Sequence, residues 1–248
     1  MNLKSLFIFV ILLSLLASCT PESSIPNEGS ELTIINLQVT PALIHWLSQA
    51  ATCANSIPDF GVYTRVFQPE SLDLNDADLI LRMGEPQEKD PHIAVMGIEE
   101  LVIVVGNQVP LSSISLSSLR AIFNGRLKNW SEVPEIIDAN IEIKQPIQPW
   151  SYPEGHELNI WFTDSILLID DIAPNVKISS TVETLQNEFQ KNPYGISYLL
   201  KSQMREGFQK LSITGINPPL IQYYVLVITN EEPSDRVKQL LLCLQNPN

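Results

Sequence analysis

The sequence predicts an α/β fold in which the first strands run parallel. Two observations carry this prediction. A run rich in β-branched residues at Leu32–Val39 leads directly into Thr40-Pro41, a typical helix N-cap followed by proline at the first helical position. Two further apolar runs follow, at Gly61–Phe67 and Asp78–Met83. The alternation of strand and helix is typical of a parallel α/β sheet.

In the first half of the chain, the spacing of apolar residues predicts where helices and strands lie. After the first strand, apolar residues recur at helical spacing, and β-branched or purely apolar runs then mark strands. We expect a helix carrying Leu43, Ile44, Leu47 and Ala50, and strands at Gly61–Phe67 and Asp78–Met83. Residues His92–Val105 form an apolar stretch that Gly97–Glu100 interrupts, and Leu101–Val105 is its most strand-like part. We then expect a helix over Leu116–Phe123 that Ser115 caps and Gly125 ends.

The second half follows the same logic. Alternating or buried apolar runs predict strands, and amphipathic periods predict helices. We expect a strand at Ile141–Ile147, helices at Leu158–Leu168 and Val182–Phe189, strands at Gly195–Leu199 and Tyr223–Thr229, and a closing helix at Asp235–Leu244. The chain contains no internal repeat.

Length and composition indicate an ordered, acidic protein. The 248 residues are enough for one or two domains with a sizeable core, and 44% of them are hydrophobic. Fifteen Lys and Arg against 28 Asp and Glu give a net charge of −13. Because such a chain repels polyphosphate, a nucleic-acid partner is disfavoured.

The first residues are typical of an export signal. Lys4 precedes an apolar run at Leu6–Ala17 that is shorter than the roughly 20 residues needed to span a bilayer. The run ends in Leu16-Ala17-Ser18-Cys19, which resembles a bacterial lipobox, whose cysteine becomes lipid-modified after cleavage. The alternative is an ordinary secretory leader cut nearby.

We therefore expect three processing features. Residues 1–18 form a lipoprotein signal peptide, residues 19–30 form a flexible tether with almost no large apolar side chain, and lipid on Cys19 anchors the protein at an extracytoplasmic membrane surface.

Export changes how the two remaining cysteines are interpreted. Cys53 and Cys243 would then lie in an oxidising compartment, where a disulfide persists. A bond between them would stabilise the fold by about 4–5 kcal/mol in the chain-entropy model. The alternative is two buried thiols, and the residues alone leave both open.

One segment resembles a known family. A helix ending in Ile122-Phe123-Asn124-Gly125, a short turn and Trp130 are similar to the segment that marks the phosphate-binding-protein-like branch of the type II periplasmic binding proteins. Weaker similarities follow in the family's order, at Val39–Leu43, Gly97–Val104 and Asn192–Tyr198. The motif around Phe123 and Trp130 is itself better interpreted as packing than as ligand contact.

The resemblance implies two α/β lobes with mixed sheets, joined by crossing strands around a ligand cleft. The N-terminal lobe would comprise residues 31–106 and 218–248, and the C-terminal lobe residues 107–217. Cys53 and Cys243 would then share a lobe, which favours a bridge between them.

The resemblance also implies a function without catalysis. Members capture a small ligand, here a phosphate-like oxyanion, and deliver it to an ABC transporter permease, so we expect no cofactor, no metal and no enzymatic activity. The three histidines are better interpreted as structural, and the sequence contains no nucleophile elbow, zinc motif or Walker loop.

Position in the fold selects the candidate ligand-binding residues. In open α/β sheets, ligands lie beyond the carboxyl ends of strands. The candidates are Gln38, Val39, Thr40, Arg82 and Ser151. Alternatively, Thr40 is a plain N-cap and Arg82 forms a surface pair with Glu85 or Asp78.

One stretch departs from the family. Phosphate binders carry an "R…SGT" run after the strand expected at Ile141–Ile147, and the corresponding residues 148–157 lack it. Glu154 and Glu157 would bring negative charge towards an anion. Nearby Trp150, Tyr152 and Trp161 favour an organic ligand if they line the cleft, but core packing explains them as well. The alternative function is therefore a degenerate binding domain that serves as an extracellular sensor or interaction module.

Overall fold

The structure is a computed structural model that describes residues 32–88, 90–168, 170–215 and 222–246. The chain from Thr33 onward forms one compact unit. The expected signal peptide, the tether and the lipid-carrying Cys19 lie outside the described residues, and these assignments stay predictions. Within the described residues, no helix combines the length and the apolar character needed to cross a membrane.

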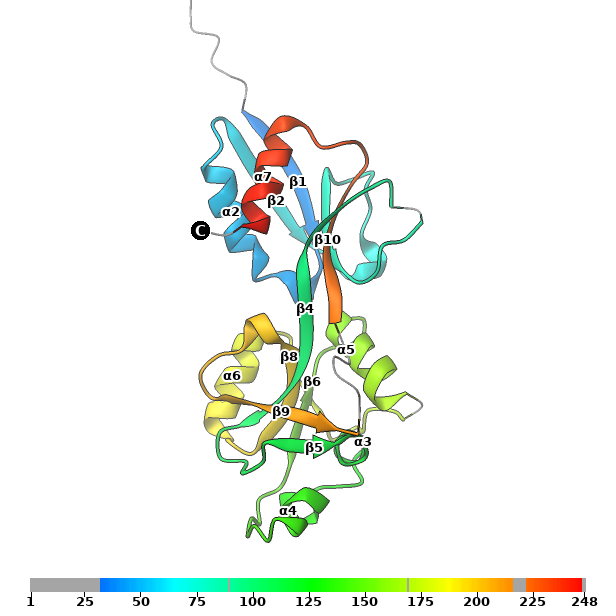
Figure 1. Cartoon of the computed structure of the whole chain (residues 1–248), viewed down its shortest axis with the longest axis vertical. Coiled ribbons are helices and arrows are strands. Elements are labelled where there is room, and N and C mark those ends of the chain that lie inside the picture. The colour runs from blue at the N-terminus through cyan, green and yellow to red at the C-terminus, as the bar shows by residue number, and fades with distance from the viewer. Residues whose placement is uncertain (1–31, 89, 169, 216–221, 247–248) are drawn as a thin grey trace, which may run out of the picture. The chain divides into compact units, whose positions relative to one another are not determined.

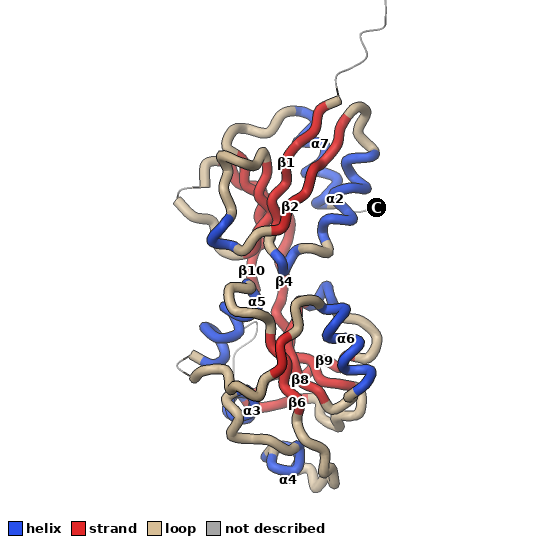
Figure 2. The backbone as a smooth tube through the Cα atoms, turned by 180° about the vertical axis from the view of Figure 1, so that it is seen from behind, coloured by secondary structure: helices blue, strands red, loops and turns tan. Residues whose placement is uncertain are grey.

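The molecule is built on a mixed sheet, in agreement with the predicted fold class (Figures 1 and 2). Its neighbouring strands follow the order β2-β1-β3-β10-β4-β8-β6-β7, and β9 pairs with both β4 and β5. The strands are β1 (Thr33–Val39), β2 (Phe60–Val66), β3 (Leu79–Met83), β4 (His92–Gly106), β5 (Ser113–Ser115), β6 (Gln148–Ser151), β7 (Lys177–Ile178), β8 (Gly195–Leu200), β9 (Phe208–Thr214) and β10 (Gln222–Thr229).

Helices connect and cover these strands. They are α2 (Trp46–Asn55), α3 (Leu116–Phe123), α4 (Pro134–Asp138), α5 (Glu157–Phe162), α6 (Val182–Lys191) and α7 (Asp235–Gln245), with 3-10 turns at Pro41–Leu43, Pro69–Ser71, Trp130–Glu132 and Lys201–Gln203 and a π-helical turn at Thr163–Leu167.

The first lobe, as we use the term, is the region built on β1, β2, β3 and β10 with α2 and α7. Strand β1 pairs parallel with β2 and β3, as the strand–helix–strand pattern predicts, and β10 pairs antiparallel with β3. The second lobe is the region built on β5, β6, β8 and β9 with α3 to α6. The predicted boundaries at residues 31–106, 107–217 and 218–248 stay a proposal.

Strand β4 belongs to both regions. His92–Glu100 pairs with β10, and Leu101–Gly106 pairs with β8 and β9. The segment Gly97–Glu100 interrupts the apolar stretch in the sequence, but the strand runs through it and extends on both sides of Leu101–Val105. The irregularity lies in the pairing, as a register shift opposite Val225 and Leu226.

The strand predicted at Ile141–Ile147 is also wrong, because the strand begins only at Gln148. The apolar positions of the alternating pattern do face the core, since Ile143 and Ile147 are both buried. Pro146 lacks an N–H group and forms only an isolated bridge with Asn129. The segment therefore contributes apolar side chains to the core without a continuous ladder.

The helix expected directly after Thr40-Pro41 is divided in two. Pro41–Leu43 forms a single 3-10 turn, and the α-helix α2 begins only at Trp46. Thr40 takes the extended N-cap conformation without a capping bond from its side chain. The hydroxyl of Thr40 is therefore left available for another role.

The segment that suggested the family folds as expected. Ser115 accepts a hydrogen bond from the Ser118 amide and caps α3, and Gly125 takes a positive φ of 77° after the helix end. Phe123 and Trp130 are fully buried, and the Trp130 indole donates to the Tyr194 carbonyl at 2.9 Å. Both aromatic residues pack in the core, in agreement with the packing interpretation.

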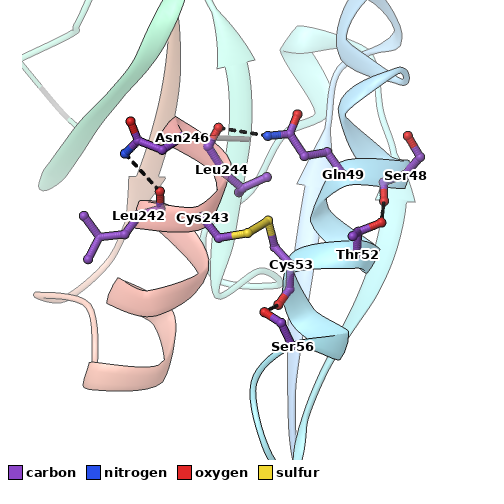
Figure 3. The surroundings of a disulfide bond; sticks show 9 residues. All are labelled: Ser48, Gln49, Thr52, Cys53, Ser56, Leu242, Cys243, Leu244 and Asn246. Carbon is purple, nitrogen blue, oxygen red and sulfur yellow. Dashed lines mark hydrogen bonds between the residues drawn. A yellow bond between two sulfur atoms is a disulfide. The ribbon is translucent and has the colours of Figure 1, made fainter. Parts of the chain in front are cut away.

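Two helices of the first lobe are covalently joined. Helices α2 and α7 lie side by side in both views, and the structure links Cys53 to Cys243 across 190 residues of sequence (Figure 3). One turn away, the Gln49 amide donates to the Leu244 carbonyl at 3.0 Å. The bond closes the loop that contains nearly the whole described chain.

Candidate functional site

A buried carboxylate lies where the first lobe presents hydrogen-bond donors. The Ala42 amide, just after β1, donates to Glu157 Oε2 at 3.3 Å. The Met83 amide, at the end of β3, also donates to this carboxylate, and the Thr40 hydroxyl faces it. We call the donors of Thr40, Ala42 and Met83 the cradle. Glu157 is only 3% exposed.

Local sequence explains why the cradle exists. Strands β1 and β3 are parallel neighbours, paired through Leu37–Val39, so their carboxyl ends meet at one edge of the sheet. The Thr40 amide donates to the Leu81 carbonyl at 3.2 Å, which ties the two strand ends together. Because the 3-10 turn begins at Pro41, the Ala42 amide has no partner within the turn. The chain thus directs free donors towards a single point.

Burial and hydrogen bonds act oppositely on Glu157. Loss of water disfavours its charged form and raises its pKa to about 7, although the Thr40 hydroxyl, the Ala42 and Met83 amides and the Arg82 charge all lower it. The Thr40 oxygen has no well-formed hydrogen bond of its own. The carboxylate is therefore held in the cradle at a cost in solvation.

A short turn of the second lobe delivers Glu157 to this position. Gly155 takes a φ of 80°, which bends the chain before α5. The imidazole of His156 accepts a hydrogen bond from the Leu158 amide and caps the helix, so that Glu157 occupies its first turn. Burial lowers the pKa of His156 to about 4. The neutral imidazole thus acts as a structural cap.

Beside Glu157 lies a cavity of about 430 Å³. Its wall combines the charged groups Asp73, Arg82, Asp90 and Glu157 with apolar side chains that include Trp161. Trp161 stacks on Tyr223 with ring centroids 3.9 Å apart, where α5 lies beside the start of β10 (Figure 1). Three carboxylates against one guanidinium make this cavity unfavourable for a free anion.

Arg82 does reach the cavity, but its charge is already paired. Its guanidinium donates to Asp90 at 2.6 Å and to the Glu85 carbonyl at 3.1 Å. The alternative expected for Arg82 named Glu85 or Asp78, and the acidic partner is instead Asp90. Because both side chains are largely buried, the pair is a fixed part of the wall.

Gln38 and Val39 support the strand end from inside. The Gln38 side-chain oxygen accepts from the Asp73 amide at 2.9 Å, and the Val39 side chain lies in the core. Of the residues predicted at the end of β1, only Thr40 directs a polar side chain towards Glu157.

Ser151 lies inside the second lobe. Its hydroxyl is 2.7 Å from the Tyr198 hydroxyl and accepts from the Asn159 amide at 3.0 Å. Ser151 is 1% exposed. These neighbours use its hydrogen-bonding capacity, so its predicted ligand role has no support in the geometry and stays a prediction.

The aromatic residues divide between core and cavity. Trp150 packs in a core cluster, and Tyr152 is buried with its ring stacked on His156. Only Trp161 lines the cavity beside Glu157. Glu154, the other acidic residue predicted near the site, is exposed and does not line that cavity.

The two backbone amides of the cradle are not among the residues predicted from the sequence. Ala42 and Met83 act through N–H groups, which no side-chain pattern reveals. A usable signal existed in the positions of both residues at strand ends. Among the described residues, no group of three or more His, Cys, Asp or Glu side chains is arranged to hold a metal ion.

Comparison with solved structures identifies the fold. A putative phosphate ABC transporter substrate-binding protein with bound phosphate from Clostridium perfringens superposes with a TM-score of 0.69 at 12% identity, covering 84% of this chain and 91% of that chain. An ABC-type phosphate transport receptor from Vibrio cholerae gives a TM-score of 0.63 at 13% identity, with coverage of 86% and 94%. The chain thus has the two-lobe fold of the type II periplasmic binding proteins, and the resemblance seen in the sequence is confirmed at the level of fold.

The same fold occurs in regulatory proteins. The CcmR regulatory domain from Synechocystis, in complex with 2-PG, superposes with a TM-score of 0.59 at 14% identity, covering 86% of this chain and 95% of that chain. No protein-family model matches the sequence, and no curated protein does. At these identities the likeness establishes the fold alone.

Proposed function

We propose that this chain is an extracytoplasmic, lipid-anchored solute-binding protein that captures a small ligand between its lobes and delivers it to an ABC importer. The observation that carries the proposal is the cradle. Two backbone amides and a threonine hydroxyl of the first lobe converge on one oxyanion group supplied by the second lobe. This is the donor set of a site that binds an oxyanion and releases it unchanged.

The proposed anchor is the lipid on Cys19, and transport would follow from opening and closing of the lobes. Solved structures of phosphate-binding proteins with the same fold support the phosphate-like oxyanion as the ligand to test first.

A thermal unfolding panel tests the proposal. The full chain in a mild detergent would be heated with phosphate, sulfate, molybdate, sugars and small amines. A ligand at 100 times its dissociation constant should stabilise the folded state by about 2.7 kcal/mol. Absence of a shift with every compound in the panel would contradict a solute-binding role.

The anchor has its own test. Cells expressing the wild-type chain or C19S would be fed a radiolabelled fatty acid and fractionated. Label and protein should stay with the membrane for the wild type, and both should leave it for C19S. Label on C19S would contradict the assignment of Cys19.

Two observations favour a second candidate, a degenerate domain that acts as an extracellular sensor or interaction module. Glu157 occupies the cradle, and Ser151 is engaged within its own lobe. A regulatory domain with the same fold supports this alternative. It predicts that no small ligand changes the unfolding temperature, while a pull-down of the wild-type chain recovers a partner that E157A does not.

A further inference from the structure

The position of Glu157 has a meaning beyond a generic ligand cleft. Its carboxylate comes from the second lobe, and all the groups that donate to it or face it with a hydroxyl belong to the first lobe. Carboxylates and phosphates share the same requirement, since both accept hydrogen bonds and carry negative charge. In this structure an acidic side chain therefore does what a bound oxyanion would do.

Thr40 gives an independent indication of a ligand site. The residue is fully buried, yet its hydroxyl oxygen has no well-formed hydrogen bond. Buried hydroxyl groups are nearly always paired, because leaving one unpaired costs about 1–3 kcal/mol. The Thr40 hydroxyl faces the Glu157 carboxylate, so its unmet capacity is directed into the cradle.

Glu157 is an imperfect occupant. Its bond from the Ala42 amide is long, at 3.3 Å, and charge-assisted bonds of this kind are usually about 2.7–2.9 Å. The carboxylate is attached to the first turn of α5, whereas a free ion can move to the best position. A free oxyanion would thus form shorter bonds with the same donors.

We infer that Glu157 is a tethered occupant of an oxyanion site formed by Thr40, Ala42 and Met83, and that a free oxyanion binds there only when this side chain has left. The inference rests on the proposed function only for the class of ligand. Apparent affinity for a free oxyanion falls by the fraction of molecules in which the cradle is vacant. Glu157 thereby sets the concentration of oxyanion at which the site fills.

The test compares oxyanion binding across matched variants. Phosphate and sulfate would be titrated by calorimetry into the full chain carrying wild-type Glu157, E157A, E157Q or E154A. E157A removes the occupant, and E154A removes the same charge from an exposed position three residues away. We expect E157A to bind phosphate or sulfate about tenfold tighter or more, equal to about 1.4 kcal/mol, and E154A to match the wild type.

Two further variants connect any gain to the cradle. E157Q keeps the size of the side chain but replaces an acceptor oxygen with a donor NH₂, so it should also release the site and serves where E157A does not fold. E157A combined with T40V removes the hydroxyl and should lose most of the gained affinity. Circular dichroism verifies that each variant is folded.

The outcomes are decisive in both directions. Equal oxyanion affinity for wild type and E157A would overturn the inference, and so would undetectable binding by the folded E157A and E157Q chains. A gain that E154A reproduces, or that survives T40V, would overturn it as well. The proposed function can fail separately from this inference. If E157A gains oxyanion affinity while the wild type binds no ligand of the panel, the inference stands and the solute-binding role is contradicted. If the wild type binds a sugar or an amine and E157A gains no oxyanion affinity, the solute-binding role stands and the inference about Glu157 is overturned.

Discussion

The two lobes contribute unequal chemistry to the region around Glu157. The first lobe directs the Thr40 hydroxyl and the Ala42 and Met83 amides, at the ends of β1 and β3, towards Glu157. The second lobe keeps its candidate hydroxyl, Ser151, inside a closed network with Tyr198 and extends only an acceptor. In this structure the first lobe thus supplies the hydrogen-bond donors, and the second lobe supplies the carboxylate.

This difference teaches that the two sides of the contact depend on different features of the chain. Backbone donors at strand ends follow from the topology of the sheet. The complementary half depends on particular side chains, and here residues 148–157 carry an acid in place of an anion-binding run. The acid fills the site from within.

Loss of the disulfide, which is confined to the first lobe, should have the largest effect on the free energy of unfolding. It joins two helices of the first lobe, and the sequence has no cysteine between Cys53 and Cys243. Reduction should lower the free energy of unfolding by about 4–5 kcal/mol in the chain-entropy model. Urea unfolding with and without reductant measures this. C53S/C243S is the control and should not respond to reductant, and a wild type that does not respond either would show that the bond contributes nothing.

S151A tests whether the second-lobe hydroxyl is structural. Its removal takes one hydrogen bond each from Tyr198 and Asn159, which both keep a bond to the Tyr152 backbone, and should cost about 1 kcal/mol of unfolding free energy. S112A, at an exposed serine, should change stability little. Oxyanion affinity of E157A should be the same with and without S151A. A loss of that affinity would return Ser151 to the binding site and remove the asymmetry between the lobes.

The pH dependence of stability tests the cost of the buried acid. The pKa of Glu157 is raised to about 7 in the folded state, so the folded chain binds more protons than the unfolded chain between about pH 4.5 and 7. Stability from this group is therefore highest below pH 4.5 and falls as pH rises to 7, by up to about 1.4 kcal/mol per pH unit.

His156 acts in the same window. Burial lowers its pKa to about 4, so that its contribution makes stability rise with pH up to about 6.5. Subtracting the E157Q curve from the wild-type curve isolates Glu157. Denaturant unfolding at several pH values should show this difference falling from pH 4.5 to 7, with E154Q following the wild type. A flat difference would mean that Glu157 is solvated in solution.

T40V should have the smallest effect on stability, and it tests whether the Thr40 hydroxyl interacts with Glu157. The Thr40 hydroxyl has no well-formed bond to lose, so replacement by a methyl group should change the unfolding free energy by less than about 1 kcal/mol. Because the hydroxyl lowers the pKa of Glu157, that pKa should rise further in T40V. NMR titration of the labelled carboxyl measures this, and an unchanged pKa would separate Thr40 from the cradle.

Much of the fold could be predicted from residue patterns. The cap at Ser115, the turn at Gly125 and the strand–helix–strand start follow from local chemistry, and each is present. The missing strand at Ile141–Ile147 has a clear cause. Burial periodicity at Ile141–Ile147 reports which side chains face the core, but a strand also needs a partner for every backbone group, and Pro146 lacks a donor.

The candidate site shows the same division. The sequence by itself determined that Thr40 and Arg82 end their strands and that an acidic residue stands where an anion-binding run is expected, because these facts are local. Only the tertiary structure decided that Arg82 pairs with Asp90, that Ser151 turns inward, and that Glu157 reaches the amides of another lobe. The physical reason is that backbone donors carry no sequence signature. Their partner Glu157 is 115 residues away from Ala42 in the sequence, and the two meet only because the packing of the two lobes brings α5 next to the end of β1.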